Sequence, residues 1–483
     1  MNYVKGIDRT QIQFECLNDY IDDESDVLVI DKLVDLMDLV SMGFIVGNNE
    51  ESGRARFDCK DLLKLYIYGY SNGIRSSRKL QKQTLINREI IWLLKGVQPK
   101  YRAIADFRKE NIEPLKKVFE VFTDFCNELG LYGKELIAVD GTKIEANASR
   151  KKHYSKSKLK VMKEKVRERV QQYINELEKN DSIEESNENE VNKDKLKAAI
   201  NALEDKIKNY ENIEKTLDEK GVSEINLTDP DARTMNFNNY GKDLAYNVQT
   251  VVDSKNKLIV TFNVTNQVND LGEIYNMSKK AMDKLGVETI EALADKGYFN
   301  IDELEKCKQS GITTYVARQK ENNSTGNQDY VLSKFIYDKN EDLFICPEGQ
   351  KLYCHTQKQD ASEKSYYNYG ICEGCINRDK CTTSKNGRKL CVKKNYEVGR
   401  EVLTRTEANY EKYKTRQMII EHPFGTIKRV FNMDYFLLRN LAPVGGEVSV
   451  AFFAYNLKRV IKILGINQLI NKIVTKKVIR YGI

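Results

Sequence analysis

The chain has 483 residues, more than one domain usually holds, so two to four domains are expected. Apolar residues make up 41% of it and charged residues 31%, so it can bury a core and still present a heavily solvated surface. Its net charge of +7 permits nucleic-acid binding without requiring it, because the clustering of basic residues matters more than their sum.

Hydropathy argues against a membrane protein, since no run of about 18 uncharged apolar residues occurs. The first residues, MNYVKGIDRTQIQFE, lack the apolar core of a signal peptide. We therefore expect a cytoplasmic protein without a membrane partner. Its ten Cys should be reduced there, which favours metal binding or burial over disulfides.

Residues 1–130 are expected to be mostly helical, because apolar residues repeat at helical spacing over 26–40 and again from residue 58. Basic residues gather just after a Tyr-rich stretch, and Arg75, Arg78 and Lys79 are candidates for contact with DNA phosphates. This pattern favours a DNA-binding domain built on a helix-turn-helix-like module. The alternative is a helical bundle whose Lys and Arg form a solvated face.

Residues 131–154 and 222–320 are predicted to form one sheet domain. Its elements alternate as strand, strand, strand, helix, strand, helix, strand. The early strands predict an antiparallel meander, and the later strand–helix alternation predicts parallel additions. The class is therefore α/β: a mixed sheet with flanking helices, in the order of the RNase H-like fold.

Two insertions are expected to interrupt this domain. Residues 155–221 carry two apolar stripes at helical spacing, separated by an acidic, Asn-rich loop over 180–194, and predict a helical hairpin. Residues 321–400 are polar and rich in Cys. Residues 401–483 return to helical patterns, and the apolar stripe of GGEVSVAFFAYNLKRVIKILG should pack on the core as these helices complete the sheet domain.

Three carboxylates stand in strand, strand and helix order: Asp140, Asp295 and Glu421. Each one alone would be an ordinary turn, cap or surface residue. Together they could converge at one edge of the sheet and hold two Mg²⁺ (or Mn²⁺) ions over a phosphodiester. The other carboxylates that could serve as ligands are Glu145, Asp253 and Asp231.

Several segments carry a resemblance to a known family: VDGTKIEANASRKK, TDPDART, YGKDLAYNVQTVVD, VTNQVNDLGE, ADKGYFN and EHPFGTIKR. They resemble bacterial insertion-sequence transposases of the DDE class, and LLKLYIYGYSNGIRSSRKL resembles the helical N-terminal domain of these enzymes. The resemblance implies an RNase H-like catalytic domain whose Asp-Asp-Glu triad is Asp140, Asp295 and Glu421.

One branch of this class has a tyrosine–arginine–glutamate–lysine signature, Y-x₂-R-x₃-E-x₆-K. Tyr413 and Arg416 keep its first spacing, and Glu421 and Lys428 keep its last. Four residues rather than three separate Arg416 from Glu421, which rotates Arg416 by about 100° from the expected helix face. Tyr413, Arg416, Lys428 and Arg429 are the candidate DNA contacts of this segment.

The second insertion holds a compact group of thiols. Cys372, Cys375, Cys381 and Cys346, which heads the turn CPEG, suit a tetrahedral structural Zn²⁺ site. Cys354 and Cys391 fall in predicted strands and are left out of it. Similar transposases carry the same Cys pattern here. The alternative is a set of redox-active or merely buried thiols.

Basic residues also follow the first carboxylate, and Arg150, Lys151 and Lys152 are predicted DNA contacts. The Lys-rich stretch over 156–160 could equally be the solvated face of the hairpin.

The resemblance implies a DNA transposase that works in a bacterial cytoplasm, on the nucleoid when bound to DNA. It would bind terminal inverted repeats, cut them and join the 3′-hydroxyl ends to target DNA, with a homodimer holding two ends. The alternatives are an RNase H-like nuclease without strand transfer and a catalytically silent DNA-binding derivative.

Overall fold

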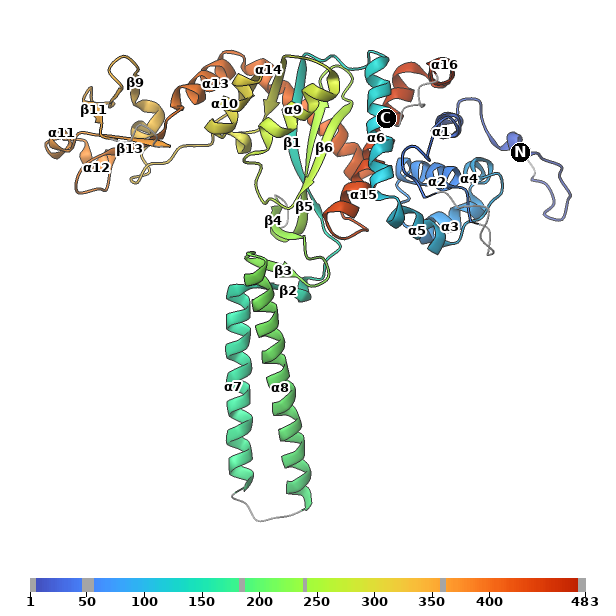
Figure 1. The fold of residues 1–483 in the computed structure, drawn as a ribbon, viewed down its shortest axis with the longest axis horizontal. Helices are drawn as coiled ribbons and strands as arrows, with labels where there is room; N and C mark the ends of the chain where they lie inside the picture. The colour runs from blue at the N-terminus through green and yellow to red at the C-terminus, as the bar shows by residue number, and fades with distance from the viewer. Residues whose placement is uncertain (1–5, 46–55, 182–186, 238–240, 357–361, 477–483) are drawn as a thin grey trace, which may run out of the picture.

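The computed structural model describes residues 6–45, 56–181, 187–237, 241–356 and 362–476. They form an elongated body with N-terminal helices at one end, a mixed sheet in the middle and a small Cys-bearing sheet at the other end (Figure 1). A long helical pair projects away from this body. Within these ranges no helix is both long and apolar enough to cross a bilayer.

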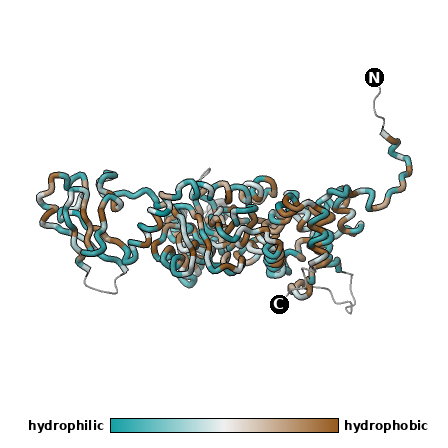
Figure 2. Tube along the Cα trace, turned by 90° about the horizontal axis from the view of Figure 1, so that it is seen from above, coloured by the Kyte–Doolittle hydropathy of each residue, from teal (hydrophilic) through white to brown (hydrophobic). Residues whose placement is uncertain are grey.

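The N-terminal part is helical, as predicted. After a short 3₁₀ turn, η1 (Leu17–Tyr20), its helices are α1 (Asp26–Asp35), α2 (Cys59–Ser71), α3 (Ser77–Ile86), α4 (Arg88–Leu93), α5 (Tyr101–Glu110) and α6 (Ile112–Glu128). Helix α2 begins where the Asp58 side chain accepts the Lys60 N–H at 2.8 Å, and almost all of it is buried. Figure 2 shows hydrophobic segments running through these helices and the central body.

The central sheet has the strand order β4-β5-β1-β7-β8, and β6 also pairs with β5. The strands are β1 (Leu136–Glu145), β4 (Arg233–Phe237), β5 (Gly241–Asp253), β6 (Ile259–Thr265), β7 (Ile290–Ala294) and β8 (Ile312–Val316). β5 runs antiparallel to β1, β4 and β6, whereas β1, β7 and β8 are parallel. The predicted mixed sheet, an antiparallel meander extended by parallel strands, is confirmed.

The helices that flank this sheet are α9 (Glu273–Leu285), α10 (Ile301–Gln309), α13 (Tyr396–Ala408), α14 (Tyr410–Gly425) and α15 (Leu441–Leu464). The last helix, α16 (Ile466–Lys476), packs against α1 and α15. A π-helical turn, η6 (Thr426–Val430), continues α14. Helix α15 is buried from Val444 to Leu457 because it packs against α6, α2 and β6. It therefore joins the N-terminal helices and the sheet into one hydrophobic core.

The projecting pair consists of α7 (Lys156–Asp181) and α8 (Asn187–Glu219), which lie antiparallel on a two-stranded ribbon of β2 (His153–Ser155) and β3 (Glu224–Asn226). Leu159, Val166, Tyr210 and Leu217 form its own small core. Both helices extend into the stretch predicted as a loop, of which residues 182–186 lie outside the described residues.

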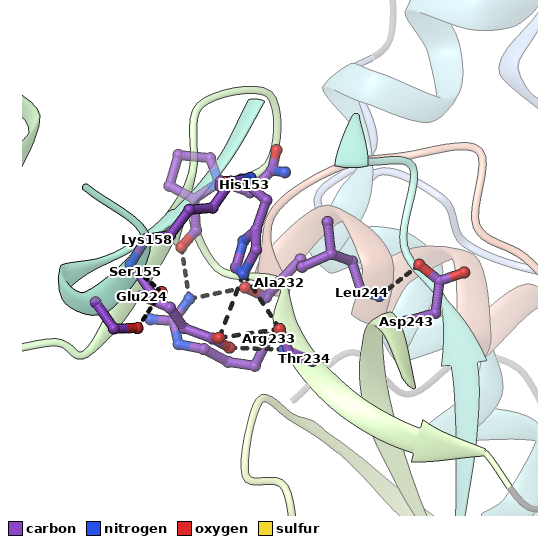
Figure 3. A network of polar contacts seen from close by, with 12 residues as sticks. His153, Ser155, Lys158, Glu224, Ala232, Arg233, Thr234, Asp243 and Leu244 are labelled. Atoms are coloured by element: carbon purple, nitrogen blue, oxygen red, sulfur yellow. Dashed lines mark hydrogen bonds and ion pairs between the residues drawn. The ribbon is translucent and has the colours of Figure 1, made fainter. Parts of the chain in front are cut away.

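A polar network fixes the base of this pair to the sheet edge (Figure 3). The Glu224 carboxylate accepts the Thr234 N–H at 2.6 Å and the Thr234 hydroxyl at 2.9 Å, and lies 3.3 Å from His153 Nε2. The hydrogen bond from His153, then those from Thr234, lower the pKa of Glu224 to about 2 despite its burial. Because Thr234 belongs to β4, the pair is anchored directly to the central sheet.

The Cys-bearing part is an antiparallel sheet in the order β13-β12-β11-β10-β9. Its strands are β9 (Ile336–Asp338), β10 (Leu343–Ile345), β11 (Lys351–Cys354), β12 (Glu363–Tyr367) and β13 (Lys389–Lys393), with two short helices, α11 (Tyr369–Glu373) and α12 (Arg378–Cys381). It has a separate core around Phe344 and Tyr366. Cys354 and Cys391 lie in strands, as predicted.

Arg75 is a buried structural residue, contrary to its predicted role as a DNA contact. Its side chain is 4% exposed and its guanidinium donates to Glu447 Oε1 at 3.0 Å and to the Tyr435 and Asn432 carbonyls. Glu447 in turn accepts the Leu437 and Leu438 N–H groups at 3.0 Å. The guanidinium is therefore used inside the protein, between the N-terminal helices and α15.

Glu447→Gln should destabilise the protein strongly. Breaking a buried pair by removing one charge costs about 3–5 kcal/mol, because the other charge stays buried without compensation. Chemical denaturation of the purified variant measures the loss. Lys79→Gln, on the exposed face of α3, is the control and should change the unfolding free energy by less than about 0.5 kcal/mol.

Candidate active site

Asp140 and Asp295 lie side by side at one edge of the central sheet. In the parallel pairing of β1 with β7, Val139 is opposite Ala294, so the next residue of each strand is an aspartate. Asp140 accepts the N–H of Gly141 at 2.9 Å, and Asp295 accepts the N–H of Lys296 at 2.7 Å as the cap of a short 3₁₀ turn, η3 (Lys296–Tyr298). Strand register thus creates a pair of like charges.

Arg416 of α14 bridges this pair. Its Nη1 lies 3.2 Å from Asp140 Oδ2 and its Nη2 lies 3.9 Å from Asp295 Oδ1. Burial nevertheless raises the pKa of Asp140 to about 6; Arg416 and the Gly141 N–H oppose the shift, and the charges of Asp295 and Asp270 add to it. Asp140 is therefore a carboxylate whose ionised form the fold stabilises incompletely.

Lys428 and Tyr413 approach the same edge from the segment that carries Arg416. Lys428 Nζ donates to the Lys143 carbonyl of β1 at 3.0 Å, and burial lowers its pKa. Tyr413 is half-buried beside Arg416; burial raises its pKa, and the nearby Asp295 charge adds to the rise. Arg429 is exposed.

Glu421 is exposed and makes no contact with either aspartate. Five helical residues after Arg416, it is turned by about 140° from the Arg416 face. The π turn that follows contains one residue more than an α-helical turn, which changes the helix phase by roughly 100°. Lys428 therefore lies on the same side of the helix as Arg416. The additional residue between Arg416 and Glu421 thus turns Glu421, and not Arg416, away from the aspartate pair. The spacing had predicted the opposite, that Arg416 would lie off the expected helix face.

The other candidate carboxylates lie elsewhere. Asp253 is buried and accepts the N–H groups of the turn at Gly133 and Lys134, beside the start of β1. Asp231 accepts the Leu441 N–H at the start of α15. Glu145 is five residues from Asp140 along β1, roughly 16 Å away. All three carboxylates therefore lie away from the Asp140–Asp295 pair.

Asp270, which sequence analysis did not single out, does lie at the site. It follows β6 in the loop before α9 and accepts hydrogen bonds from Asn247 Nδ2 at 2.7 Å and Gln249 Nε2 at 2.6 Å. The available signal was the segment VTNQVNDLGE, which contributes to the resemblance but gave no reason to choose this acid over its neighbours.

As the side chains stand, the described residues contain no group of three or more His, Cys, Asp or Glu close enough to hold a metal ion. At the aspartate pair, the Arg416 guanidinium supplies the positive charge instead. The donors nevertheless fit a divalent cation chemically, since carboxylate oxygens are the ligands that Mg²⁺ prefers.

The four predicted zinc ligands line one small cavity. Cys346, Cys372, Cys375 and Cys381 surround a space of about 30 Å³, close to the room for one water or ion. Cys346 Sγ accepts the Gln350 N–H at 3.3 Å, and burial raises the pKa of Cys381 to about 11. All ten cysteines are unpaired thiols.

Two of the predicted basic surfaces are exposed. Arg78 and Lys79 lie on the outer face of α3, and Lys151 and Lys152 lie on the short turn η2 (Arg150–Lys152) before the helical pair. Arg150 is 74% exposed and pairs with Asp243. These residues can reach a phosphate backbone without rearrangement of the core.

Comparison with known families gives two matches to segments of this chain. Residues 345–461 match the family model described as Transposase DDE domain, and residues 15–110 match the one described as Transposase domain (DUF772). No curated protein matches the chain. The two matches support the resemblance of this chain to insertion-sequence transposases of the DDE class.

Asp140→Asn should stabilise the protein at neutral and alkaline pH. The folded-state pKa of Asp140 lies above the value in the unfolded chain, so ionisation costs the fold stability, fully so above the folded pKa. The shift corresponds to about 2–3 kcal/mol. Denaturation of both proteins should therefore show a gain for the variant that is larger at pH 8 than at pH 5. A variant less stable than wild type at pH 8 would contradict this.

Proposed function

We propose that this protein is a DNA transposase that cleaves the ends of an insertion sequence and joins them to target DNA. The observation that carries the proposal is the Asp140–Asp295 pair at the sheet edge, bridged by Arg416 and approached by Lys428. The match to the transposase DDE domain supports it and includes Glu421, the third proposed acid. The strand order supports an RNase H-like fold for the catalytic domain.

Asp140, Asp295 and Glu421 would hold two Mg²⁺ or Mn²⁺ ions. When bound, these cations would activate the attacking water or hydroxyl and stabilise the leaving oxygen. The aspartates bind and orient them as fixed anionic oxygens on rigid strands. With a cation at the pair, the negative charge that Arg416 now neutralises would be neutralised by the cation. The Arg416 guanidinium would then be able to contact a DNA phosphate.

DNA binding would use the basic residues around this edge. Lys428 and Arg429 follow α14, and Lys151 and Lys152 follow β1, so positive charge flanks the acidic pair on both sides in sequence. Arg78 and Lys79 on α3 would contact the backbone of the terminal repeats. Because the chemistry involves two DNA ends, we propose that two copies of the chain act together on DNA.

Cleavage of the element's own DNA tests this function. The substrate is a linear fragment that carries this chain's coding sequence with its flanks, incubated with protein and Mg²⁺. Asp140→Asn, Asp295→Asn and Glu421→Gln should each lower cleavage by at least about 100-fold, beyond the 10–100-fold typical of partners outside a ligand shell. Asp283→Asn, on the exposed surface of α9, is the matched control and should cleave normally.

The products separate the alternatives. Joined products in the wild-type reaction support strand transfer, whereas cleavage without joining would favour a nuclease. If Asp295→Asn cuts as well as wild type, the aspartate pair is not the active site.

We also propose that the four cysteines around the small cavity bind a structural Zn²⁺. Cys346 directly follows β10, Cys372 lies on α11 and Cys375 just after it, and Cys381 ends α12. Their place around one cavity, with an N–H donated to Cys346 Sγ, supports a tetrahedral thiolate site. The ion would tie the two short helices to the sheet, which has a small core of its own.

Metal analysis of the purified protein tests this site. About one zinc per chain is expected, falling to near zero in Cys372→Ser and Cys375→Ser. Cys391→Ser is the control, because Cys391 lies exposed on β13, outside the cavity. Wild-type protein without zinc would overturn the proposal.

A further inference from the structure

Asp270 lies beside Gly141 of β1 and beside the short turn η3 that follows Asp295. A Cβ built on Gly141 would lie 2.5 Å from Asp270 Oδ1, and one on Gly297 would lie 3.6 Å from Oδ2. Gly141 directly follows Asp140, and Gly297 is two residues after Asp295. The carboxylate therefore lies against the backbone of β1 and of η3, with no intervening side chain.

Its two oxygens have different environments. Oδ1 is held by the amides of Asn247 and Gln249, and Gln249 is itself fixed by the buried Tyr298 hydroxyl. Oδ2 faces Gly297 and has no hydrogen bond to any group in the described part of the chain. One oxygen thus anchors the side chain, and the other remains available as a ligand.

Two buried oxygens, one beside Asp270 and one beside Asp140, also lack partners among the described residues. Asn247 is 1% exposed, and its Oδ1 has no donor although it lies 2.8 Å from the position a Gly141 Cβ would take. Thr250, opposite Asp140 in the β1–β5 pairing, is fully buried and its Oγ1 is unpaired. A buried oxygen without a hydrogen bond destabilises the fold, and a cation or its bound water would offset that cost.

The cation site is thus bordered from both faces of the sheet. Side chains alternate along β1, so Asp140 shares a face with Thr250 and meets Arg416 of α14, whereas Gly141 shares the other face with Gln249 and meets Asp270. Asp270 therefore adds a negative charge beside Gly141, the residue that directly follows Asp140.

We propose that Asp270 is a further carboxylate of the divalent-cation site proposed for Asp140, Asp295 and Glu421, with Oδ2 binding the cation or one of its waters. The proposal rests on the cation-dependent function given above and adds a residue to it. Gln249 is then a positioning residue, because its amide holds Asp270 Oδ1 and its own oxygen accepts from Tyr298.

Mn²⁺ binding by the full chain without DNA tests this, with free Mn²⁺ measured by electron paramagnetic resonance. Asp270→Asn keeps the size of the side chain but removes its charge, and should weaken Mn²⁺ binding about tenfold or more. Gly297→Ala leaves the hydrogen bonds of Asp270 unchanged but places a methyl group 3.6 Å from Oδ2, and should weaken binding as well. Asp283→Asn should bind as wild type does.

The pattern across variants separates this proposal from the function on which it rests. Loss of Mn²⁺ binding in Asp140→Asn with wild-type binding in both Asp270→Asn and Gly297→Ala overturns the role of Asp270 alone. Wild-type binding in Asp140→Asn overturns the aspartate site itself. A merely anchoring Asp270 would lower the melting temperature of Asp270→Asn without changing its Mn²⁺ affinity; if that variant does not fold, Gly297→Ala decides.

Discussion

The charge balance around Asp140 and Asp295 is the constraint on which the site depends. Parallel pairing of β1 with β7 sets two carboxylates at neighbouring strand positions, and Asp140 is largely removed from water. Like charges in such a setting repel, and burial penalises their ionised forms. Arg416 reduces this cost but does not remove it, since the pKa of Asp140 is still raised to about 6. Because Arg416 does not fully compensate the two carboxylates, the Asp140–Asp295 site favours binding of an additional cation.

Helix α14 must therefore hold Arg416 and Lys428 on the sheet side together. Lys428 is twelve positions after Arg416, and in a regular α-helix this spacing would turn Lys428 by about 120° from Arg416. The π turn over Thr426–Val430 corrects the phase, and Lys428 reaches the β1 backbone. π turns are often found at functional sites, where they accommodate an inserted residue without breaking the helix. The irregularity in the sequence signature thus has a structural counterpart.

The mixed sheet, its strand directions and the burial of α15 could be predicted from apolar patterning, because each strand and helix has enough apolar residues to fix its type. The nearness of Asp140 and Asp295 also followed from two strand ends in one sheet. The position of Asp270 could not be predicted, because it depends on the loop after β6, which brings Asp270 to the side-chain amides of Asn247 and Gln249 on β5. Nor could that of Glu421, whose direction depends on helix phase. Arg75 was misjudged because a basic cluster in sequence does not reveal which of its members is buried.

Arg75 links the N-terminal helices to residues 431–436, the segment after the π turn that carries Lys428. Its guanidinium donates to the carbonyls of Asn432 and Tyr435 in this segment. Gly73, with a φ of 69°, packs so closely that an added Cβ would lie 2.9 Å from the Val430 carbonyl. Glu145, the last residue of β1, forms a bridge with Tyr435. This segment is thus held by the N-terminal helices on one side and by β1 on the other. Helix α3, which begins two residues after Arg75, is therefore connected to the strand that carries Asp140. In the proposed function, this connection would let α3 fix where the backbone of a bound DNA end meets the aspartates.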